Sequence, residues 1–356
     1  MKSPKKVFVG LSGGVDSSVT ALRLKKQGYV VVGVFIKVWH PDFLECDEER
    51  DRLDAMRVAA HLGIPFLTLD AEEVYKRDVA DYMIQEYREG RTPNPDVMCN
   101  KHVKFGAFLD FAKAQGADYV ATGHYAQIDK DSDGFYHLHR GRDPEKDQSY
   151  FLWTLTQEQL AHVLFPIGDS VKDNIRKEAA AAGLPTAQKH DSQGICFLGK
   201  VDIEEFLSHY IDLKAGSVLD EEGSVIGTHT GALLYTLGQR HGFTVTKKGT
   251  DEEPSFVIAK DLLANTITVA HERQQVEKKD VRLHQLNLIR SGSSTEGSIS
   301  AQFRYRQKPF PIELTLLKDG AATLKVQAEV ETPSVGQSCV LYRDSECLGG
   351  GIIASC

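Results

Sequence analysis

The stretch GLSGGVDSSV, residues 10–19, concentrates glycines and serines between an apolar run and a helical pattern. A glycine-rich turn before a helix exposes backbone N–H groups, and the helix dipole favours negative charge there. Gly13 and Gly14 would let the chain turn tightly and let phosphate oxygens approach the backbone, and the serine hydroxyls would add donors. The stretch therefore predicts a phosphate-binding loop. The alternative is an unoccupied turn that only starts a helix.

This loop lacks the lysine of G-x-x-x-x-G-K-[ST] and the spacing of G-x-G-x-x-G, which argues against a Walker-type NTPase and a Rossmann dehydrogenase. The motif resembles the loop of the N-type ATP pyrophosphatases. That resemblance implies that the β- and γ-phosphates of ATP leave together, after a substrate has captured the α-phosphate as an adenylate. The missing lysine fits that outcome, because a Mg²⁺ ion could neutralise the departing diphosphate and Asp16 could help to hold that ion.

Two cysteines lie in segments that are compatible with sulfur chemistry. Cys99 follows two prolines in GRTPNPDVMCNKHVKF, residues 90–105, and lies close to the start of a predicted helix that carries two lysines. A helix N-terminus and nearby ammonium groups lower the pKa of a thiol and favour the nucleophilic thiolate. Cys196 lies in a glycine-flanked turn within HDSQGICFLGK, residues 190–200. For each residue taken alone, an inert buried or loop cysteine remains the alternative.

The elements that must position these segments alternate between strand and helix up to about residue 122. The predicted strands cover residues 6–11, 29–36, 65–70 and 117–123, and the predicted helices cover residues 15–27, 46–63 and 102–116. Such alternation predicts a parallel sheet with helices on both faces. A short strand pair with turn formers interrupts the pattern at residues 129–149, and two more helices follow. After about residue 210, short β-rich runs separated by polar turns continue to the end.

Composition sets the protein class. With 356 residues, 41% of them hydrophobic and 26% charged, the chain is typical of a globular protein with two or three domains. A net charge of -8 means that any RNA contact must come from local basic patches. We find no secretory signal and no run of the ~18 apolar residues that a membrane span needs, so we expect a cytoplasmic protein. Six cysteines without a CxxC pair argue against a disulfide framework and a zinc ribbon.

Six ordered segments resemble the MnmA-type tRNA-specific 2-thiouridylases, and the resemblance runs nearly end to end. These segments are GLSGGVDSSV, TPNPDVMCNKHVKF, ATGHYAQ, KDQSYFLWTL, SQGICFLG and YTLGQRHG. The resemblance implies ATP-dependent 2-thiolation of the wobble uridine of tRNA, with release of AMP and pyrophosphate. It implies an α/β fold with an adenine-nucleotide α-hydrolase-like sheet domain at residues 1–210, a small β-rich connector at 211–277 and a C-terminal six-stranded β-barrel at 278–356.

The resemblance also implies roles for individual residues. Cys196 would carry a persulfide received from a donor or relay protein, Cys99 would be its catalytic partner, and Asp96 would be the acid or base near the target uracil. The residues implied to bind ATP are Gly10, Leu11, Ser12, Gly13, Gly14, Val15, Asp16, Ser17, Ile36 and Gly123. Those implied to contact tRNA are Asn94, Pro95, Asp96, His124, Lys146, Asp147, Gln148, Arg304, Tyr305 and Gln337.

Several of these roles have plain alternatives. Asp96 could be only the cap of the Cys99 helix, and His124 could be structural. Residues 146–148 could be a solvated charged loop. Residues 304–306 alternate along a predicted strand, so that two arginines form a basic face and Tyr305 points the other way, but an exposed edge strand would look the same.

The sulfur chemistry leaves two routes open. Cys99 either attacks the Cys196 persulfide to free hydrosulfide, or resolves the adduct after direct persulfide attack; both routes end in a Cys99–Cys196 disulfide. An iron-sulfur cluster held by Cys99, Cys196 and Asp96 is a further alternative that we do not favour. Two rival functions are a different adenylating enzyme, which would not need the two cysteines, and a tRNA-binding protein without catalytic activity. The other four cysteines are expected to be structural or surface thiols.

Overall fold

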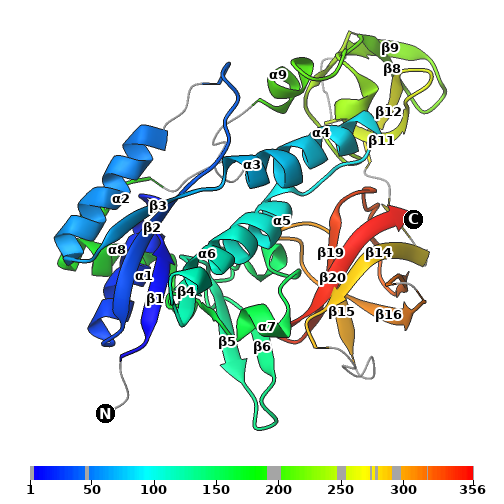
Figure 1. Cartoon of the computed structure of the whole chain (residues 1–356). Helices are drawn as coiled ribbons and strands as arrows, with labels where there is room; N and C mark the ends of the chain where they lie inside the picture. The colour runs from blue at the N-terminus through cyan, green and yellow to red at the C-terminus, as the bar shows by residue number, and fades with distance from the viewer. Residues whose placement is uncertain are drawn as a thin grey trace.

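The computed structural model describes residues 4–44, 48–190, 202–246, 254–272, 275–276, 280–290, 298–318 and 320–355. Three main sheets organise these residues, and Figure 1 shows them in order from the blue N-terminal part to the red C-terminal barrel. Cys196 lies outside the described residues, as do Cys46 and Cys356. Among the residues described, no helix has the length and apolarity of a membrane span.

The first sheet is parallel, with strand order β3-β2-β1-β4-β7. Its strands are β1 (Lys6–Gly10), β2 (Val30–Lys37), β3 (Phe66–Asp70), β4 (Tyr119–Ala121) and β7 (Val163–Leu164). Side chains alternate across it, so Val7 and Val9 pack into one hydrophobic cluster and Phe8 packs into another. The prediction of a parallel sheet covered on both faces is confirmed.

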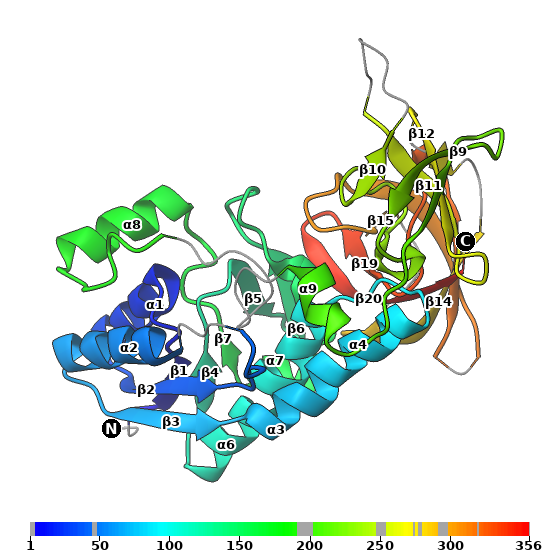
Figure 2. The same cartoon turned by 90° about the horizontal axis from the view of Figure 1, so that it is seen from above.

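The helices form two layers around this sheet (Figure 2). One layer contains α1 (Val15–Lys26), α2 (Glu48–Leu62) and α8 (Lys172–Ala181). The other contains α3 (Glu72–Tyr75), a π-helix (Lys76–Ala80), α4 (Asp81–Arg88), α5 (Pro95–Met98), a second π-helix (Cys99–Ala107) and α6 (Phe108–Ala114). Two short elements follow, a 3-10 turn (Ser149–Phe151) and α7 (Gln157–Leu160). The helical run from 72 to 88 had no counterpart among the predicted elements.

A small β-rich unit follows, beginning with α9 (Ile203–Ser208). Its sheet has the order β10-β9-β8-β12-β11. The strands are β8 (Gly216–Leu219), β9 (Val225–His229), β10 (Phe243–Val245), β11 (Phe256–Asp261) and β12 (Thr266–Ala270), with a 3-10 turn at Ala232–Leu234. Phe206 and Leu207 of α9 share a hydrophobic cluster with Met83 and Ile84 of α4, so this unit packs against the helical residues 72–88.

The C-terminal part is a closed antiparallel barrel, as expected. Six strands follow one another in the order β14-β17-β16-β15-β19-β20, and pairing of β14 with β20 closes the ring. They are β14 (Asp280–Leu288), β15 (Ile299–Gln302), β16 (Phe310–Leu316), β17 (Ala322–Val326), β19 (Ser338–Arg343) and β20 (Glu346–Ser355). The short strands β13 (Gln275–Val276) and β18 (Val330–Glu331) pair beside it.

A hairpin connects the α/β part directly to the barrel. Strands β5 (Ala126–Lys130) and β6 (Tyr136–Arg140) form this hairpin, and β6 pairs with β20. One hydrophobic cluster therefore contains Phe8 of the parallel sheet together with Tyr342 and Ile352 of the barrel. The strand pair expected near residues 129–149 exists, but its pairing with the barrel was not anticipated.

Candidate active site

The glycine-serine loop connects the end of β1 to the start of α1. Gly14 is the N-cap of α1 and has an extended backbone, with φ -96° and ψ 168°. Gly13 has φ +71°, which side chains rarely adopt, and a Cβ at this position would overlap the carbonyl oxygen of Asp51 on α2. Of these two glycines, Gly13 is thus required by the backbone and by the close approach of a neighbouring helix.

Two of the loop's serines hold the loop itself. The Ser18 hydroxyl donates to the carbonyl oxygen of Gly14 at 2.7 Å and accepts from the Thr186 hydroxyl at 2.9 Å. The Ser17 hydroxyl donates to the same carbonyl at 3.2 Å and accepts from the backbone N–H of Ser12 at 3.3 Å. Ser18 is fully buried, so its expected role as a phosphate donor is wrong in this structure; Ser12, by contrast, is exposed.

Asp16, at the start of α1, is bound by two side chains that sequence reasoning did not associate with it. The Lys172 ammonium lies 2.8 Å from each carboxylate oxygen, and the Tyr125 hydroxyl donates to Oδ1 at 2.8 Å. Lys172 is 8% exposed. A lysine therefore does lie beside the loop, although it comes from α8. No local signal could have identified it, because Lys172 is about 150 residues away in the chain.

Three of the residues implied to bind ATP, Gly10, Ile36 and Gly123, lie at the carboxyl ends of the parallel strands, where such sheets bind ligands. A Cβ on Gly10 would lie 3.8 Å from Ile36. Gly123 follows β4, and a Cβ there would lie 2.8 Å from the Ser17 nitrogen and 2.9 Å from the Asp16 side chain. The absence of a side chain at Gly123 thus lets the end of β4 approach the start of α1. The structure brings Gly10, Ile36 and Gly123 together with the loop.

The Cys99 segment is helical from Pro95 onward. Asn94 is the N-cap, and its side chain accepts a hydrogen bond from the Val97 N–H at 3.3 Å. The cap is therefore Asn94 and not Asp96, which lies half-buried in the first turn. This helix begins seven residues before the predicted start at residue 102, so Cys99 lies beyond the first turn, where the dipole effect has weakened.

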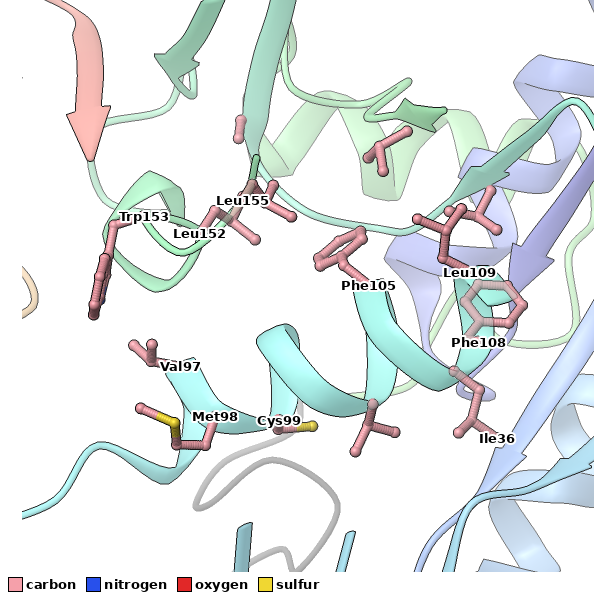
Figure 3. Packing of buried hydrophobic residues seen from close by; sticks show 14 of the residues in the cluster. Ile36, Val97, Met98, Cys99, Phe105, Phe108, Leu109, Leu152, Trp153 and Leu155 are labelled. Carbon is pink, nitrogen blue, oxygen red and sulfur yellow. The ribbon is translucent and has the colours of Figure 1, made fainter. Parts of the chain in front are cut away.

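Cys99 is 1% exposed and begins a nine-residue π-helix. Figure 3 shows it on the same helical run as Val97, Met98 and Phe105, within the cluster that also contains Ile36 and Trp153. Long π-helical stretches are rare and are often found at functional sites. The expected reactive thiol is thus placed within the core, a few turns from the residues at the adenine side.

His124 is a packed residue in this structure. Its ring lies between Phe105 and Phe165, with centroids 5.8 Å and 5.7 Å away, and its Nδ1 lies 2.7 Å from the Thr122 hydroxyl. Burial, reinforced by the nearby Lys104 charge, lowers the pKa of His124 well below its ordinary value. The ring is therefore neutral at physiological pH and 6% exposed, which fits the structural alternative better than a direct tRNA contact.

The side chains of Asp147 and Gln148 also make internal contacts. Asp147 is 8% exposed, forms an ion pair with Arg140 at 2.9 Å and accepts from the backbone N–H of Gly141. The Gln148 side chain accepts from the backbone N–H of Tyr125 at 3.0 Å. This segment is thus a built connection between the hairpin and the end of β4, and the alternative of a solvated loop is wrong for Asp147.

The prediction of a basic strand at residues 304–306 is wrong. Strand β15 ends at Gln302, and residues 303–306 form a turn in which Arg306 has φ +65°. The Gln307 side chain stabilises the turn by accepting from the backbone N–H groups of Phe303 and Arg304. The alternation of residue types predicted a strand here, but the Gln307 side chain accepts the backbone hydrogen bonds that a neighbouring strand would otherwise accept.

The barrel residues expected to contact tRNA make contacts within the protein that link its three parts. Arg304 forms an ion pair with Glu331 at 2.7 Å and donates to the Leu237 carbonyl of the small β-rich unit at 2.7 Å. The Tyr305 ring is tilted against that of Phe151, with ring centroids 4.6 Å apart. Gln337 donates to the Pro93 carbonyl at 3.3 Å, and this bond connects the barrel to the residues that lead into Asn94.

Thr92 completes that junction. Its backbone N–H donates to the Val335 carbonyl of the barrel at 2.9 Å, and its hydroxyl lies 3.0 Å from the Thr236 hydroxyl in YTLGQRHG.

Within the part of the chain that is described, no three His, Cys, Asp or Glu residues are grouped to hold a metal ion. The pKa of the fully buried Cys347 thiol is raised to about 12 by burial, and that of Cys339 is raised further, which fits structural thiols.

Comparison with known proteins bears on all three parts. Residues 5–200 match the family described as tRNA methyl transferase HUP domain, residues 204–271 its PRC-barrel domain, and residues 278–353 the aminomethyltransferase beta-barrel domain. The tRNA-specific 2-thiouridylase MnmA of Enterococcus faecalis is 46% identical over 99% of this chain and 96% of its own length. The chain belongs to the MnmA family. The MnmA of Lysinibacillus sphaericus is likewise 46% identical, over 98% of this chain and 94% of its own length.

A solved structure also overlaps part of this MnmA family member. The U34-tRNA thiolase NcsA from Methanococcus maripaludis, with its [4Fe-4S] cluster, is 17% identical and covers 58% of this chain and 64% of its own, with a TM-score of 0.35. An overlap of that extent carries no argument about chemistry. Family membership, by contrast, spans the chain, and the HUP description agrees with the parallel sheet and its nucleotide loop.

Proposed function

We propose that this protein catalyses ATP-dependent 2-thiolation of the wobble uridine of tRNA. The observation that carries the proposal is the joining, in one fold, of a lysine-free phosphate loop at β1–α1 with the helical run that holds Cys99, whose later residue Phe108 lies beside Gly10 at the start of the loop. Relatives that are 46% identical over nearly the whole chain are named tRNA-specific 2-thiouridylases, which supports the same activity here.

The chemistry has two displacements. The uracil C2 oxygen attacks the α-phosphorus of ATP, and pyrophosphate leaves from the loop that includes Gly10–Ser17. A sulfur nucleophile then attacks C2, and AMP leaves with the original oxygen. Adenylation is needed because a carbonyl oxygen is otherwise a poor leaving group. Backbone N–H groups at the start of α1 stabilise the departing diphosphate.

We further propose that Mg²⁺ accompanies ATP. This ion usually takes one or two protein carboxylates and completes its shell with phosphate oxygens and water. Asp16 suits that role by position, since it lies at the edge of the loop and is 30% exposed at its side chain. Bound there, Mg²⁺ would neutralise part of the charge of the triphosphate.

Sulfur would arrive as a persulfide on Cys196 from a donor protein, and Cys99 would be its partner. Release of hydrosulfide by Cys99, or resolution of the adduct by Cys99, forms a Cys99–Cys196 disulfide that a thiol reductant must reduce before the next turnover. Because Cys99 is 1% exposed, tRNA binding has to open the packing around it. Asp96, in the turn before Cys99, would hold or move the proton near the base.

The division of labour follows the three parts of the chain. We propose a catalytic domain at residues 1–210, a connector at 211–277 and a tRNA-contacting barrel at 278–356. The contacts of Arg304, Tyr305 and Gln337 support a barrel that is linked to the rest of the protein, and the Gln337 contact reaches Pro93, just before the helix that carries Cys99. Binding of tRNA through these residues would require some of those contacts to be exchanged.

The test is product analysis. The purified chain is incubated with ATP, a persulfide donor and unmodified tRNA, and nucleosides are identified by mass spectrometry. We expect 2-thiouridine from the wild type and from Cys356→Ser, a control cysteine to which no role is assigned, and none from Cys99→Ala or Cys196→Ala. Product from either single variant would end the two-thiol mechanism. In a parallel incubation supplemented with S-adenosylmethionine, formation of methylated uridine would replace the proposed function with the one that the matched domain description names.

A further inference from the structure

Helix α8 delivers a buried cation to the phosphate loop. Lys172 is the first residue of α8, with Val171 as the N-cap, and it is 8% exposed. Its ammonium nitrogen lies 2.8 Å from both carboxylate oxygens of Asp16. A lysine that is this buried is rare unless it is paired, so the position of this one is a built feature of the fold.

The packing of α8 against α1 fixes that position. The two helices run in the same direction, because Lys172 meets Asp16 at their starts and Glu178 meets Arg23 further along, with 2.8 Å between charged atoms in each pair. Ile175 of α8 belongs to the hydrophobic cluster that contains α1 residues. Two ion pairs and a shared core therefore hold the Lys172 ammonium at the N-terminus of α1, where the loop binds phosphate.

A fixed ammonium at this place could supply the cationic side chain that the loop itself lacks. Phosphate loops of the Walker type carry a lysine that reaches the β- and γ-phosphates, and this loop has none at the corresponding position. We propose that Lys172 is the phosphate-binding lysine of this loop, supplied by α8, and that Asp16 holds its ammonium until the triphosphate of ATP takes over as its partner. The inference rests on the proposed use of ATP at the loop.

The pair could instead serve only to attach α8 to α1, as the Arg23–Glu178 pair does. The two possibilities predict different effects on phosphate binding when the Asp16 carboxylate is removed. If Lys172 binds phosphate, Asp16 competes with phosphate for the same ammonium, and its removal frees the cation. If the pair is only structural, removal of either partner has the same consequence. A hydrogen bond between phosphate and a charged side chain is strong enough that its loss changes the affinity for phosphate measurably in a direct binding experiment.

The experiment measures binding of inorganic pyrophosphate, ATP and adenosine by calorimetry in metal-free buffer, so that catalysis is not required. For Lys172→Met we expect pyrophosphate and ATP to bind about 10- to 100-fold more weakly, with adenosine affinity unchanged. For Asp16→Asn we expect pyrophosphate to bind as tightly as to the wild type or more tightly. Lys177→Met, on the exposed part of α8, is the matched control and should behave as wild type.

Three outcomes would overturn the inference: unchanged pyrophosphate affinity in Lys172→Met, equal losses for adenosine and ATP, or equal losses of pyrophosphate affinity in Lys172→Met and Asp16→Asn. Should Lys172→Met fail to fold, Asp16→Asn still decides, because it leaves the lysine in place. The result is separable from the proposed function. A chain that binds pyrophosphate through Lys172 yet forms no 2-thiouridine would contradict only the thiolation.

Discussion

Replacing Gly13 with serine tests the geometry of the phosphate loop. Its φ of +71° costs a residue with a Cβ about 1–2 kcal/mol. The new Cβ would also overlap the Asp51 carbonyl, and overpacking of this kind costs about 1–3 kcal/mol. Asp51 cannot yield freely, because its side chain is bound by Lys189 at 2.7 Å. Together these terms predict a loss of about 2–5 kcal/mol.

Gly14→Ser is the matched comparison. Gly14 has an extended backbone, its nearest neighbour to a Cβ is the Ser12 hydroxyl at 3.4 Å, and serine is a favourable N-cap residue. We expect Gly14→Ser to melt within the error of the wild type, whereas Gly13→Ser melts several degrees lower and loses the thermal shift that ATP produces. Equal melting temperatures for the two variants would refute the reasoning about Gly13.

Three further predictions concern the surroundings of the loop. Asn94→Ala removes the N-cap bond to Val97 and should destabilise the Cys99 helix by about 0.5–2 kcal/mol, with Asn94→Asp close to wild type; chemical denaturation measures both, and equal midpoints would contradict the cap. The hydrogen bond that His137 donates to Glu346, with a second one to Asp131, raises the pKa of His137 above its ordinary value, so this contact stabilises fully at lower pH and less as pH rises through the raised pKa. The melting temperature of the wild type, compared with that of His137→Gln, should therefore fall as pH rises through the raised pKa of His137. Parallel dependence of the two melting temperatures on pH would exclude a contribution of this contact to stability. Cys347, whose pKa burial raises to about 12, should resist iodoacetamide at neutral pH in the folded protein, and its alkylation by mass spectrometry would contradict the packing.

Local pattern was sufficient for the nucleotide loop. The apolar run before it, the glycines within it and the helical spacing after it predict β1, the turn and α1 within a residue or two. These features are local because backbone sterics and amphipathic burial act over a few residues. The parallel sheet followed from the same alternation, and the closed barrel was expected from the resemblance to a known family.

The features that were missed depend on contacts between distant residues. Lys172 meets Asp16 only because α8 packs along α1, and β6 joins the barrel only because β20 has a free edge at that point. The turn at Arg304 replaces an expected strand because the Gln307 side chain satisfies the backbone there. Neither residue spacing nor composition carries such information, since tertiary contacts override local preference.

The same limit applies to the site. Segment composition singled out Cys99 as a thiol near a helix start, but its burial comes from a hydrophobic cluster that gathers residues from several other elements. The resemblance implied tRNA contacts for Gln337 and Arg304, but it gave no sign that their side chains also connect the parts of the folded chain. Exposure is decided by the whole fold and cannot be predicted from a motif.

The central claim is that ATP activates the C2 oxygen of the target uridine. The most direct measurement uses tRNA whose wobble uridine carries heavy oxygen at C2, incubated with the protein, ATP and a persulfide donor, followed by mass spectrometry of the released AMP. The account predicts that the label appears in the phosphate of AMP in proportion to the 2-thiouridine formed. Thiolated tRNA accompanied by unlabelled AMP, with the heavy oxygen found in water, would contradict it.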